Sequence, residues 1–311
     1  MKTRTPSVHS RHAKNKAPIN HDHFIVPPGT KIRLKDYDPG FTGSYKTEEE
    51  ASPKLRKDIQ RLAKLQNVLY ADNTRALLVV LQGMDAAGKD GTIRHVMSGV
   101  NPQGTQVHSF KAPSAEELEH DFLWRSTKAL PERGGIGIFN RSYYEEVLVV
   151  RVHPEILNLQ HLPPEAKGKN IWRHRFDAIN DFERFLTRNG IGILKFFLNL
   201  SKEEQKRRFL ERIATPDKNW KFSVSDAKER GHWDEYMAAF EDALHRTSTE
   251  WAPWYIIPAD NKWFTHVVVA DVIIEKLKSF KLNYPVAGKE HRRQLLKAKR
   301  VLENESSKGK R

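Results

Sequence analysis

The stretch ALLVVLQGMDAAGKDG, residues 76–91, contains the pattern on which the fold prediction depends. It begins with six apolar residues in a row, which is typical of a strand buried on both faces of a parallel sheet. A glycine-rich turn follows, and we expect a helix to start near Lys89. The turn has the spacing G-x-x-x-x-G-K of a Walker A phosphate-binding loop. Because a strand precedes the motif and a helix follows it, we predict a phosphate loop rather than a simple strand-to-helix turn.

The residue types of this loop suit phosphate chemistry. Glycines let the backbone curl so that successive N–H groups face inward and form an anion nest. The N-terminus of the next helix adds a favourable dipole, and Lys89 supplies a mobile positive charge. Small side chains in the loop let a phosphate approach the main chain. The predicted phosphate-binding residues are Gly83, Met84, Ala86, Ala87, Gly88, Lys89, Asp90 and Gly91.

Two carboxylates make this loop unusual. The residue after the Walker lysine is normally Ser or Thr, whose hydroxyl meets Mg²⁺, but here it is Asp90. Asp85 lies inside the loop. A carboxylate beside a phosphate is unfavourable unless a cation or a hydrogen bond intervenes, and carboxylate oxygens are Mg²⁺ ligands. We therefore predict that both residues help to hold magnesium, with compensation of the helix dipole as the alternative for Asp90.

Strands and helices alternate along the rest of the chain. Further strands are predicted at residues 106–110, 135–139, 191–198 and 254–258, and helices at 52–70 and 262–280, after Ser114 and after Ser201. This alternation predicts an α/β fold with a parallel sheet covered by helices on both faces.

A second signature, Asn140 to Glu146, directly follows the third predicted strand. Polar side chains at the carboxyl end of a parallel strand face the ligand crevice. Arg141 can bind phosphate oxygens bidentately and stabilise transition-state charge. A P-loop kinase usually has a metal-binding aspartate at the end of this strand. Asn140 is neutral, so it is a weaker metal-ligand candidate than this aspartate. We therefore expect Asp85 to provide more of the metal binding. Glu145 is a candidate ligand-binding residue, or a capping-box partner of Ser142.

A basic helix after Ser201 is a candidate lid over the phosphates. Arg208 and Arg212 share one helix face at i, i+4, where their charges repel unless an anion lies between them. Lys206 and Arg207 add further positive charge for phosphate or nucleotide binding. The break at Pro216 predicts a mobile continuation, so we place the lid at about residues 201–224. The alternative is a solvated face paired with acidic neighbours.

The charge distribution predicts two basic arms. The formal charge is +14, but residues 1–35 carry eight Lys and Arg against one acidic residue, and residues 281–311 carry ten against three. We predict one domain at 31–284 between two loosely structured basic ends, an arm at 1–30 and a tail at 285–311. Basic arms attract polyanions, although they can also be solvated tails without a ligand.

Composition excludes several classes of protein. The absence of cysteine excludes disulfides, thiolate catalysis and cysteine-based zinc sites. No stretch approaches the apolar length of a membrane helix, and no secretory signal is visible at the N-terminus. We therefore expect a cytoplasmic protein without membrane association.

Four motifs in order resemble the polyphosphate kinase 2 family over about residues 31–284. They are GMDAAGKDG at 83–91, FNRSYYEEVLVVRVH at 139–153, LKFFLNLSKEEQ at 194–205 and WAPWYIIPAD at 251–260. The resemblance implies a thymidylate-kinase-like P-loop fold with a helical lid, and a homodimer or homotetramer. It implies dependence on Mg²⁺, for which Mn²⁺ can substitute. It also implies phosphoryl transfer from inorganic polyphosphate to nucleoside mono- and diphosphates, such as AMP, ADP, GMP and GDP, giving di- and triphosphates.

The resemblance also implies roles for single residues. Asp85 and Lys89 match the catalytic Walker A residues, Arg141 the Walker B arginine, and Arg208 and Arg212 the lid arginines. Some members carry aspartate at the position of Asn140 and asparagine at that of Glu145. The pair found here resembles the class III branch, which accepts both mono- and diphosphates.

The residues themselves agree with phosphoryl transfer. Charge that spreads over the equatorial oxygens of the phosphoryl group must be neutralised, which Lys89, Arg141, a lid arginine and magnesium can do without a covalent nucleophile. A phosphate acceptor is already ionised, so Asp85 is better suited to metal binding and geometry than to base catalysis.

Two other functions remain open at this point. An ATP-dependent nucleoside monophosphate kinase would share the loop and differ in its donor. A basic nucleic-acid-binding protein with a non-catalytic loop would explain the charge, but the sequence shows no RNA-binding motif and no helix-turn-helix, so nucleic acid is not an expected partner.

Overall fold

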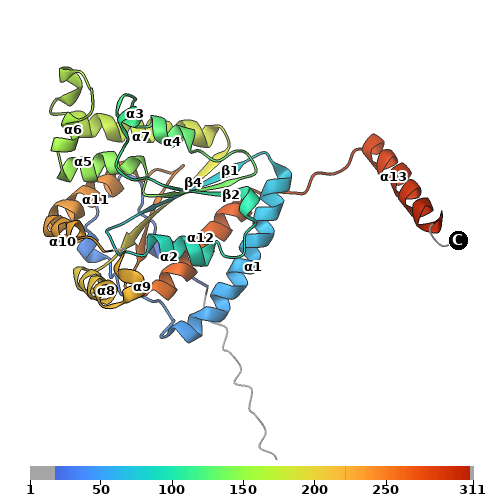
Figure 1. Ribbon diagram of the computed structural model, residues 1–311, viewed down its shortest axis with the longest axis horizontal. Coiled ribbons are helices and arrows are strands. Elements are labelled where there is room, and N and C mark those ends of the chain that lie inside the picture. The colour runs from blue at the N-terminus through green and yellow to red at the C-terminus, as the bar shows by residue number, and fades with distance from the viewer. Residues whose placement is uncertain (1–17, 221, 309–311) are drawn as a thin grey trace, which may run out of the picture.

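The computed structural model, which describes residues 18–220 and 222–308, contains one parallel sheet between two layers of helices (Figure 1). The strands lie in the order β2-β3-β1-β4-β5, and all neighbouring pairs are parallel. Their bounds are Thr105–Ser109 for β2, Ile136–Asn140 for β3, Ala76–Gln82 for β1, Ile191–Asn199 for β4 and Trp254–Pro258 for β5. The predicted α/β fold and its five strands are confirmed.

The central strand β1 shows why the sheet needs cover on both sides. All seven of its residues are buried. Leu77 and Val79 point into one core and Leu78 and Val80 into the other, because side chains alternate across a strand. The first core is covered by α1 (Glu48–Asp72), α2 (Lys89–Val96) and α12 (Lys262–Ser279), and the second by α5 (Val149–Val152), α7 (Ile171–Arg188) and α11 (Trp233–Thr247).

The long helices begin and end close to the predicted positions. α1 starts four residues before the predicted Ser52, because the Thr47 side chain caps it and three glutamates fill its first turn. The capping box of Ser114 and Glu117 is confirmed. The remaining α-helices are α3 (Ala115–Leu118), α4 (Trp124–Lys128), α6 (Glu155–Asn158), α8 (Lys202–Ala214), α9 (Pro216–Asn219), α10 (Val224–Glu229) and α13 (Lys289–Lys308). Short 3-10 turns are His21–His23, Leu34–Asp36, Pro102–Gly104, Tyr143–Val147 (η4), Pro164–Lys167 and Arg230–His232.

A fully buried ion pair lies in the second core. Lys195 of β4 and Glu183 of α7 are 2.6 Å apart, and both side chains are 0% exposed. The Glu183 carboxylate also accepts hydrogen bonds from the hydroxyls of Tyr143 and Tyr144, each at 2.9 Å. Lys195 donates to the Tyr144 hydroxyl and to the carbonyl of Thr247. This network ties η4 to β4, α7 and the end of α11.

The two basic ends differ. Residues 1–17 of the predicted N-terminal arm lie outside the described residues. The rest of that arm packs on the domain, since Phe24 and Val26 are buried and bond to β5 through main-chain groups of Trp254 and Ile256.

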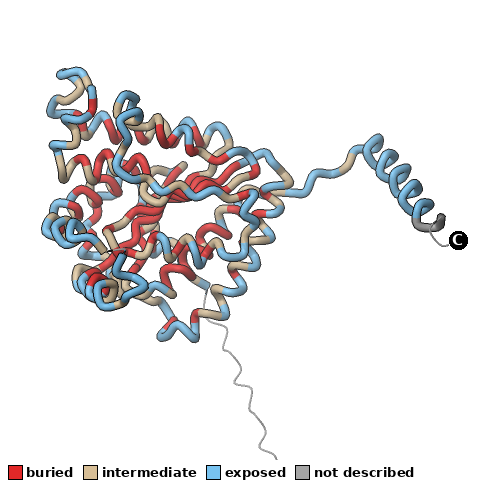
Figure 2. Tube along the Cα trace, in the orientation of Figure 1, coloured by how far each residue is buried: buried red, intermediate tan, exposed pale blue. Residues whose placement is uncertain are grey.

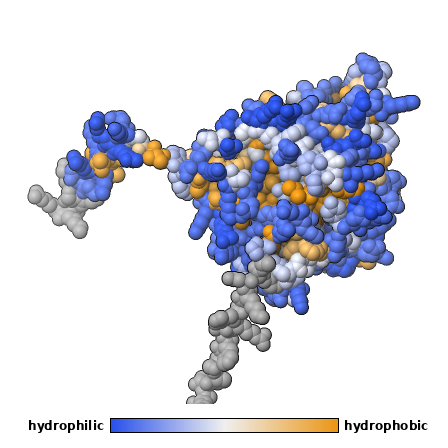
Figure 3. Space-filling model, turned by 180° about the vertical axis from the view of Figure 1, so that it is seen from behind, coloured by the Kyte–Doolittle hydropathy of each residue, from blue (hydrophilic) through white to orange (hydrophobic). Residues whose placement is uncertain are grey.

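Most of the described part of the C-terminal tail is the helix α13, so the expectation of loose structure was wrong for these residues. It stands apart from the domain, and residues 288–305 are all exposed (Figures 1 and 2). From behind, apolar residues gather near the centre of the domain surface, while α13 is mainly hydrophilic (Figure 3). Within the described residues, no helix is long and apolar enough to span a membrane.

Candidate active site

The predicted phosphate loop curls between the end of β1 and the start of α2. Gly83 has φ 149°, and a Cβ there would lie 2.9 Å from the carbonyl oxygen of Leu198, so only glycine fits. Gly88, at φ 106°, caps α2. The Lys89 side chain folds back over the loop, and its Nζ donates to the carbonyls of Gly83 at 2.6 Å and Met84 at 3.2 Å. Burial, followed by the charge of Arg141, lowers the pKa of Lys89 to about 8.

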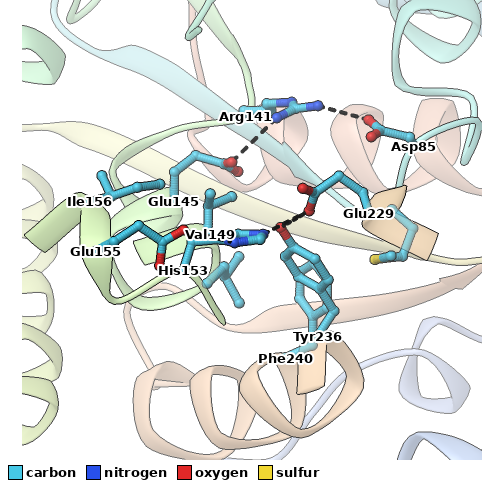
Figure 4. Close-up of a pocket in the computed structure, with 13 residues that line it drawn as sticks. Asp85, Arg141, Glu145, Val149, His153, Glu155, Ile156, Glu229, Tyr236 and Phe240 are labelled. Carbon is cyan, nitrogen blue, oxygen red and sulfur yellow. Dashed lines mark hydrogen bonds and ion pairs between the residues drawn. The ribbon is translucent and has the colours of Figure 1, made fainter. Parts of the chain in front are cut away.

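Three predicted residues form a charged chain beside the loop (Figure 4). Arg141 Nη2 is 2.7 Å from Asp85 Oδ1, and Arg141 Nη1 is 3.5 Å from Glu145 Oε2. Arg141 has φ 63°, a conformation uncommon for a residue with a side chain, and its N–H donates to the carbonyl of Leu81. Burial raises the pKa of the Glu145 carboxyl, against the opposing charges of Arg141 and Lys89. The structure therefore brings these residues together although the chain separates them.

Asp90 and Asn140, two of the metal candidates, contact each other. Asn140 Nδ2 donates to Asp90 Oδ1 at 2.6 Å, which links the end of β3 to the first turn of α2. The same geometry is compatible with the alternative role of Asp90, in which its carboxylate compensates the dipole at the N-terminus of α2.

The carboxylates near the loop fit a magnesium ion bound mainly through substrate. Burial raises the pKa of the Asp226 carboxyl, and the charge of Asp85 adds to this effect. A cation bound near Asp85 and Asp226 would reduce the repulsion between these two negative charges. In the part of the chain that the structure describes, no three His, Cys, Asp or Glu side chains converge as a metal cage. Mg²⁺ does not require one, since it binds through one or two carboxylates, substrate phosphates and waters.

A cavity of about 330 Å³ opens from the loop (Figure 4). Its two ends differ in chemistry. Predicted residues form the polar end next to the loop, namely Gly83, Met84, Asp85, Arg141 and Glu145. Apolar side chains line much of the rest, namely Leu148, Val149, Ile156 and Phe240. Such a pocket suits a ligand with a charged group at one end and a flat apolar body at the other.

Sequence reasoning missed four polar residues of this cavity, namely His153, Glu155, Glu229 and Tyr236. Tyr236 donates its hydroxyl to Glu229 Oε2 at 2.8 Å, and His153 Nε2 lies 3.0 Å from the same oxygen (Figure 4). Burial and the hydrogen bond to Glu229 raise the pKa of Tyr236. His153 belongs to a recognised motif, but nothing in the local sequence marks Glu229 or Tyr236, which reach the cavity through the packing of α10 and α11.

The basic residues of α8 point in different directions. Arg208 is buried against the phosphate loop, and Arg212 is half-buried near Asp226. Lys206 is exposed, and Arg207 pairs with Glu204 on the outer surface. Neither Lys206 nor Arg207 lines the cavity.

A phosphate loop after the central strand of a parallel sheet, a facing arginine and an adjacent basic helix define a P-loop kinase. Residues 45–284 match the family described as Polyphosphate kinase 2. Because this match covers most of the chain, and relatives 51% and 44% identical cover 90% and 84% of it, the chain belongs to the polyphosphate kinase 2 family, as its motifs predicted.

Three relatives illustrate the match. An ADP-polyphosphate phosphotransferase of Rhodopseudomonas palustris is 51% identical over 280 residues, which are 90% of this chain and 97% of that protein. An AMP/ADP-polyphosphate phosphotransferase of Meiothermus ruber is 44% identical, over 84% of this chain and 94% of that protein. The crystal structure of polyphosphate kinase 2 from Arthrobacter aurescens TC1 superposes with a TM-score of 0.78 at 40% identity, covering 85% of this chain and 92% of that one.

Proposed function

We propose that this enzyme transfers the terminal phosphoryl group of inorganic polyphosphate to nucleoside mono- and diphosphates. The observation that carries the proposal is the cavity, which joins a phosphate loop to an apolar pocket through the pair Asp85–Arg141. In the reaction, the bond from the terminal phosphorus to its bridging oxygen breaks. A bond to an oxygen of the acceptor phosphate forms, and the chain leaves one phosphate shorter.

The loop end of the cavity supplies the charges that this reaction needs. Lys89 and Arg141 lie beside the loop and can neutralise the transferring group, with Arg212 completing the set from the lid. Mg²⁺, held by Asp85 and Asp90 with Asn140 nearby, would neutralise phosphate oxygens, and Mn²⁺ can take its place. The nucleoside of the acceptor would lie against Val149, Ile156 and Phe240, so that its phosphates face Arg141.

The range of acceptors is the finer part of the proposal. Asn140 and Glu145 together resemble the class III branch, and we therefore propose that both mono- and diphosphates are accepted. The names of the two relatives differ here, since one mentions AMP and ADP and the other only ADP. By the same resemblance, we propose a homodimer or homotetramer, which light scattering on the purified protein would test.

The decisive experiment combines the protein, Mg²⁺ and long-chain polyphosphate with AMP, ADP, GMP or GDP in the absence of ATP. Chromatography then follows the nucleotides. We expect ADP and then ATP to form from AMP. If only the diphosphates are phosphorylated, polyphosphate is still the donor, but the class III assignment is wrong. No transfer from polyphosphate, with transfer from ATP instead, would favour an ordinary nucleotide kinase.

The loop assignment has its own test. We expect Lys89→Ala to remove most transfer activity, roughly 100-fold or more, because the transferring group loses its nearest cation. Circular dichroism and the melting temperature should show an intact fold. A folded Lys89→Ala protein with full activity would contradict the assignment.

A further inference from the structure

Arg208 has no donor left for a substrate. It is 3% exposed. Its Nη1 donates to the carbonyls of Ala86 at 2.8 Å and Ala87 at 3.2 Å, and its Nη2 to those of Ala259 at 2.6 Å and Asp260 at 3.0 Å. Its Nε donates to Glu204 at 2.8 Å. A guanidinium has five N–H groups, so these five bonds use all of them.

A second residue of α8 extends this contact along the loop. Gln205, three positions before Arg208 and 1% exposed, donates its Nε2 to the carbonyl of Asp85 at 2.9 Å. The two α8 side chains therefore bind three consecutive loop carbonyls, of Asp85, Ala86 and Ala87. The two preceding carbonyls, of Gly83 and Met84, are bound by Lys89.

This arrangement controls the direction of the loop amides. A peptide whose carbonyl is held on one side of the loop presents the next N–H to the other side, because the peptide unit is planar. Ala86 also has φ 65°, a conformation that costs free energy in a residue with a side chain and persists only where surrounding contacts hold it. The α8 contacts supply such a constraint at this residue.

We propose that Arg208, together with Gln205, is a positioning residue that holds the phosphate loop in its binding conformation, rather than a lid arginine that contacts phosphate. The same guanidinium connects the loop to the carbonyls after β5, so the first two turns of α8 belong to the rigid site. Motion of a lid would begin beyond Arg208, near the break between α8 and α9. Arg212 remains as the arginine available to the donor. This inference rests on the proposed function.

The test separates geometry from charge by comparing Arg208→Gln with Arg212→Gln. The measured quantities are kcat, the KM for long-chain polyphosphate and the dependence of that KM on salt. Salt dependence reports how many phosphate charges the protein neutralises, because binding releases counterions.

For Arg208→Gln we expect kcat to fall about 100-fold, as for a reacting group displaced by about 1 Å. Its KM and salt dependence should stay unchanged, because all five N–H groups of Arg208 bind the protein and none is left for a donor phosphate. Arg212→Gln should raise KM and weaken the salt dependence.

Two further variants exclude a general effect of instability. Gln205→Leu removes the bond to the Asp85 carbonyl and also the bond that Arg230 Nη1 donates to Gln205 Oε1 at 2.9 Å, and it leaves Arg208 in place. It should lower kcat about tenfold with KM unchanged. Arg125 is also buried and donates to a main-chain carbonyl, that of Lys111, but it lies beside β2, away from the loop. Arg125→Gln should lower the melting temperature. Its kcat, measured at a temperature at which the variant is folded, should equal that of the wild type.

Several results would overturn the inference. A rise in KM with weaker salt dependence for Arg208→Gln would show direct contact with the donor. If folded Arg208→Gln keeps the wild-type kcat, Arg208 stabilises the fold but does not position the loop for catalysis. If Arg208→Gln does not fold, unchanged kcat in Gln205→Leu has the same consequence. Wild-type protein that is inactive with polyphosphate would instead contradict the proposed function.

Discussion

Lys89 combines burial with a positive charge, and this combination predicts the pH dependence of the enzyme. Its pKa is lowered to about 8, first by burial and then by Arg141. The ammonium group is present below this pKa and is lost as the pH rises through it. We expect kcat/KM for polyphosphate to fall above about pH 8, since this constant reports the free enzyme.

An arginine at the same position provides the control for this profile. Arginine stays protonated over the whole range, so Lys89→Arg should be less active but should lack the alkaline fall. A profile of kcat/KM with the same fall in Lys89→Arg would assign the titration to another group.

Glu145 should influence the choice between acceptors. Its carboxylate faces Arg141 and reduces the positive charge available to the acceptor phosphates. Removal of the negative charge in Glu145→Gln should favour the more highly charged acceptor. We expect the ratio of kcat/KM for ADP to that for AMP to rise about tenfold, equivalent to about 1.4 kcal/mol. An unchanged ratio would show that this carboxylate does not affect the acceptor charge.

At the scale of elements, the buried pair Lys195–Glu183 holds the segment that carries Arg141 and Glu145. Tyr143 and Tyr144 belong to that segment and bond to Glu183. Replacement of Lys195 by methionine leaves a buried carboxylate without its partner, which typically costs about 3–5 kcal/mol. We expect a loss of this size in the free energy of unfolding measured in urea.

The double variant Lys195→Met, Glu183→Leu is the matched control, because it removes both charges. It should recover a large part of the lost stability, as buried pairs replaced by apolar residues often do. Its kcat should nevertheless lie below the wild-type value, because Tyr143 and Tyr144 lose their acceptor. Full activity in a stable double variant would show that the pair does not position Arg141.

At the scale of the whole molecule, α13 is separate from the domain. Residues 288–305 are exposed, and the family match ends at residue 284. Deletion of residues 285–311 should leave the melting temperature unchanged. It should lower kcat/KM for long-chain polyphosphate a few-fold at low salt and not at high salt, because the tail contributes long-range attraction only. A lower melting temperature would show that α13 packs against the domain or a second copy.

Much of the fold could be predicted because its signals are local. The run before Gly83, the loop itself and the capping box at Ser114 each depend on residues within about a dozen positions. The start of α1 was missed by four residues, since a single cap at Thr47 outweighed the periodicity of apolar residues. Regular structure in the C-terminal tail was missed because charge indicated solvation, although amphipathic spacing is also present there.

The sequence by itself determined the strands, the phosphate loop and the family, because hydrophobic periodicity and glycine spacing act between neighbours in the chain. Tertiary structure alone decided which side chains meet at the site. Glu229 and Tyr236 join the cavity through packing between distant elements. Arg208 looks like a phosphate-binding lid arginine in the sequence, yet in the fold its N–H groups donate to main-chain carbonyls of the loop and of the segment after β5, and to Glu204. Which way a helix face points depends on the cores it packs against, and those contacts join residues more than a hundred positions apart.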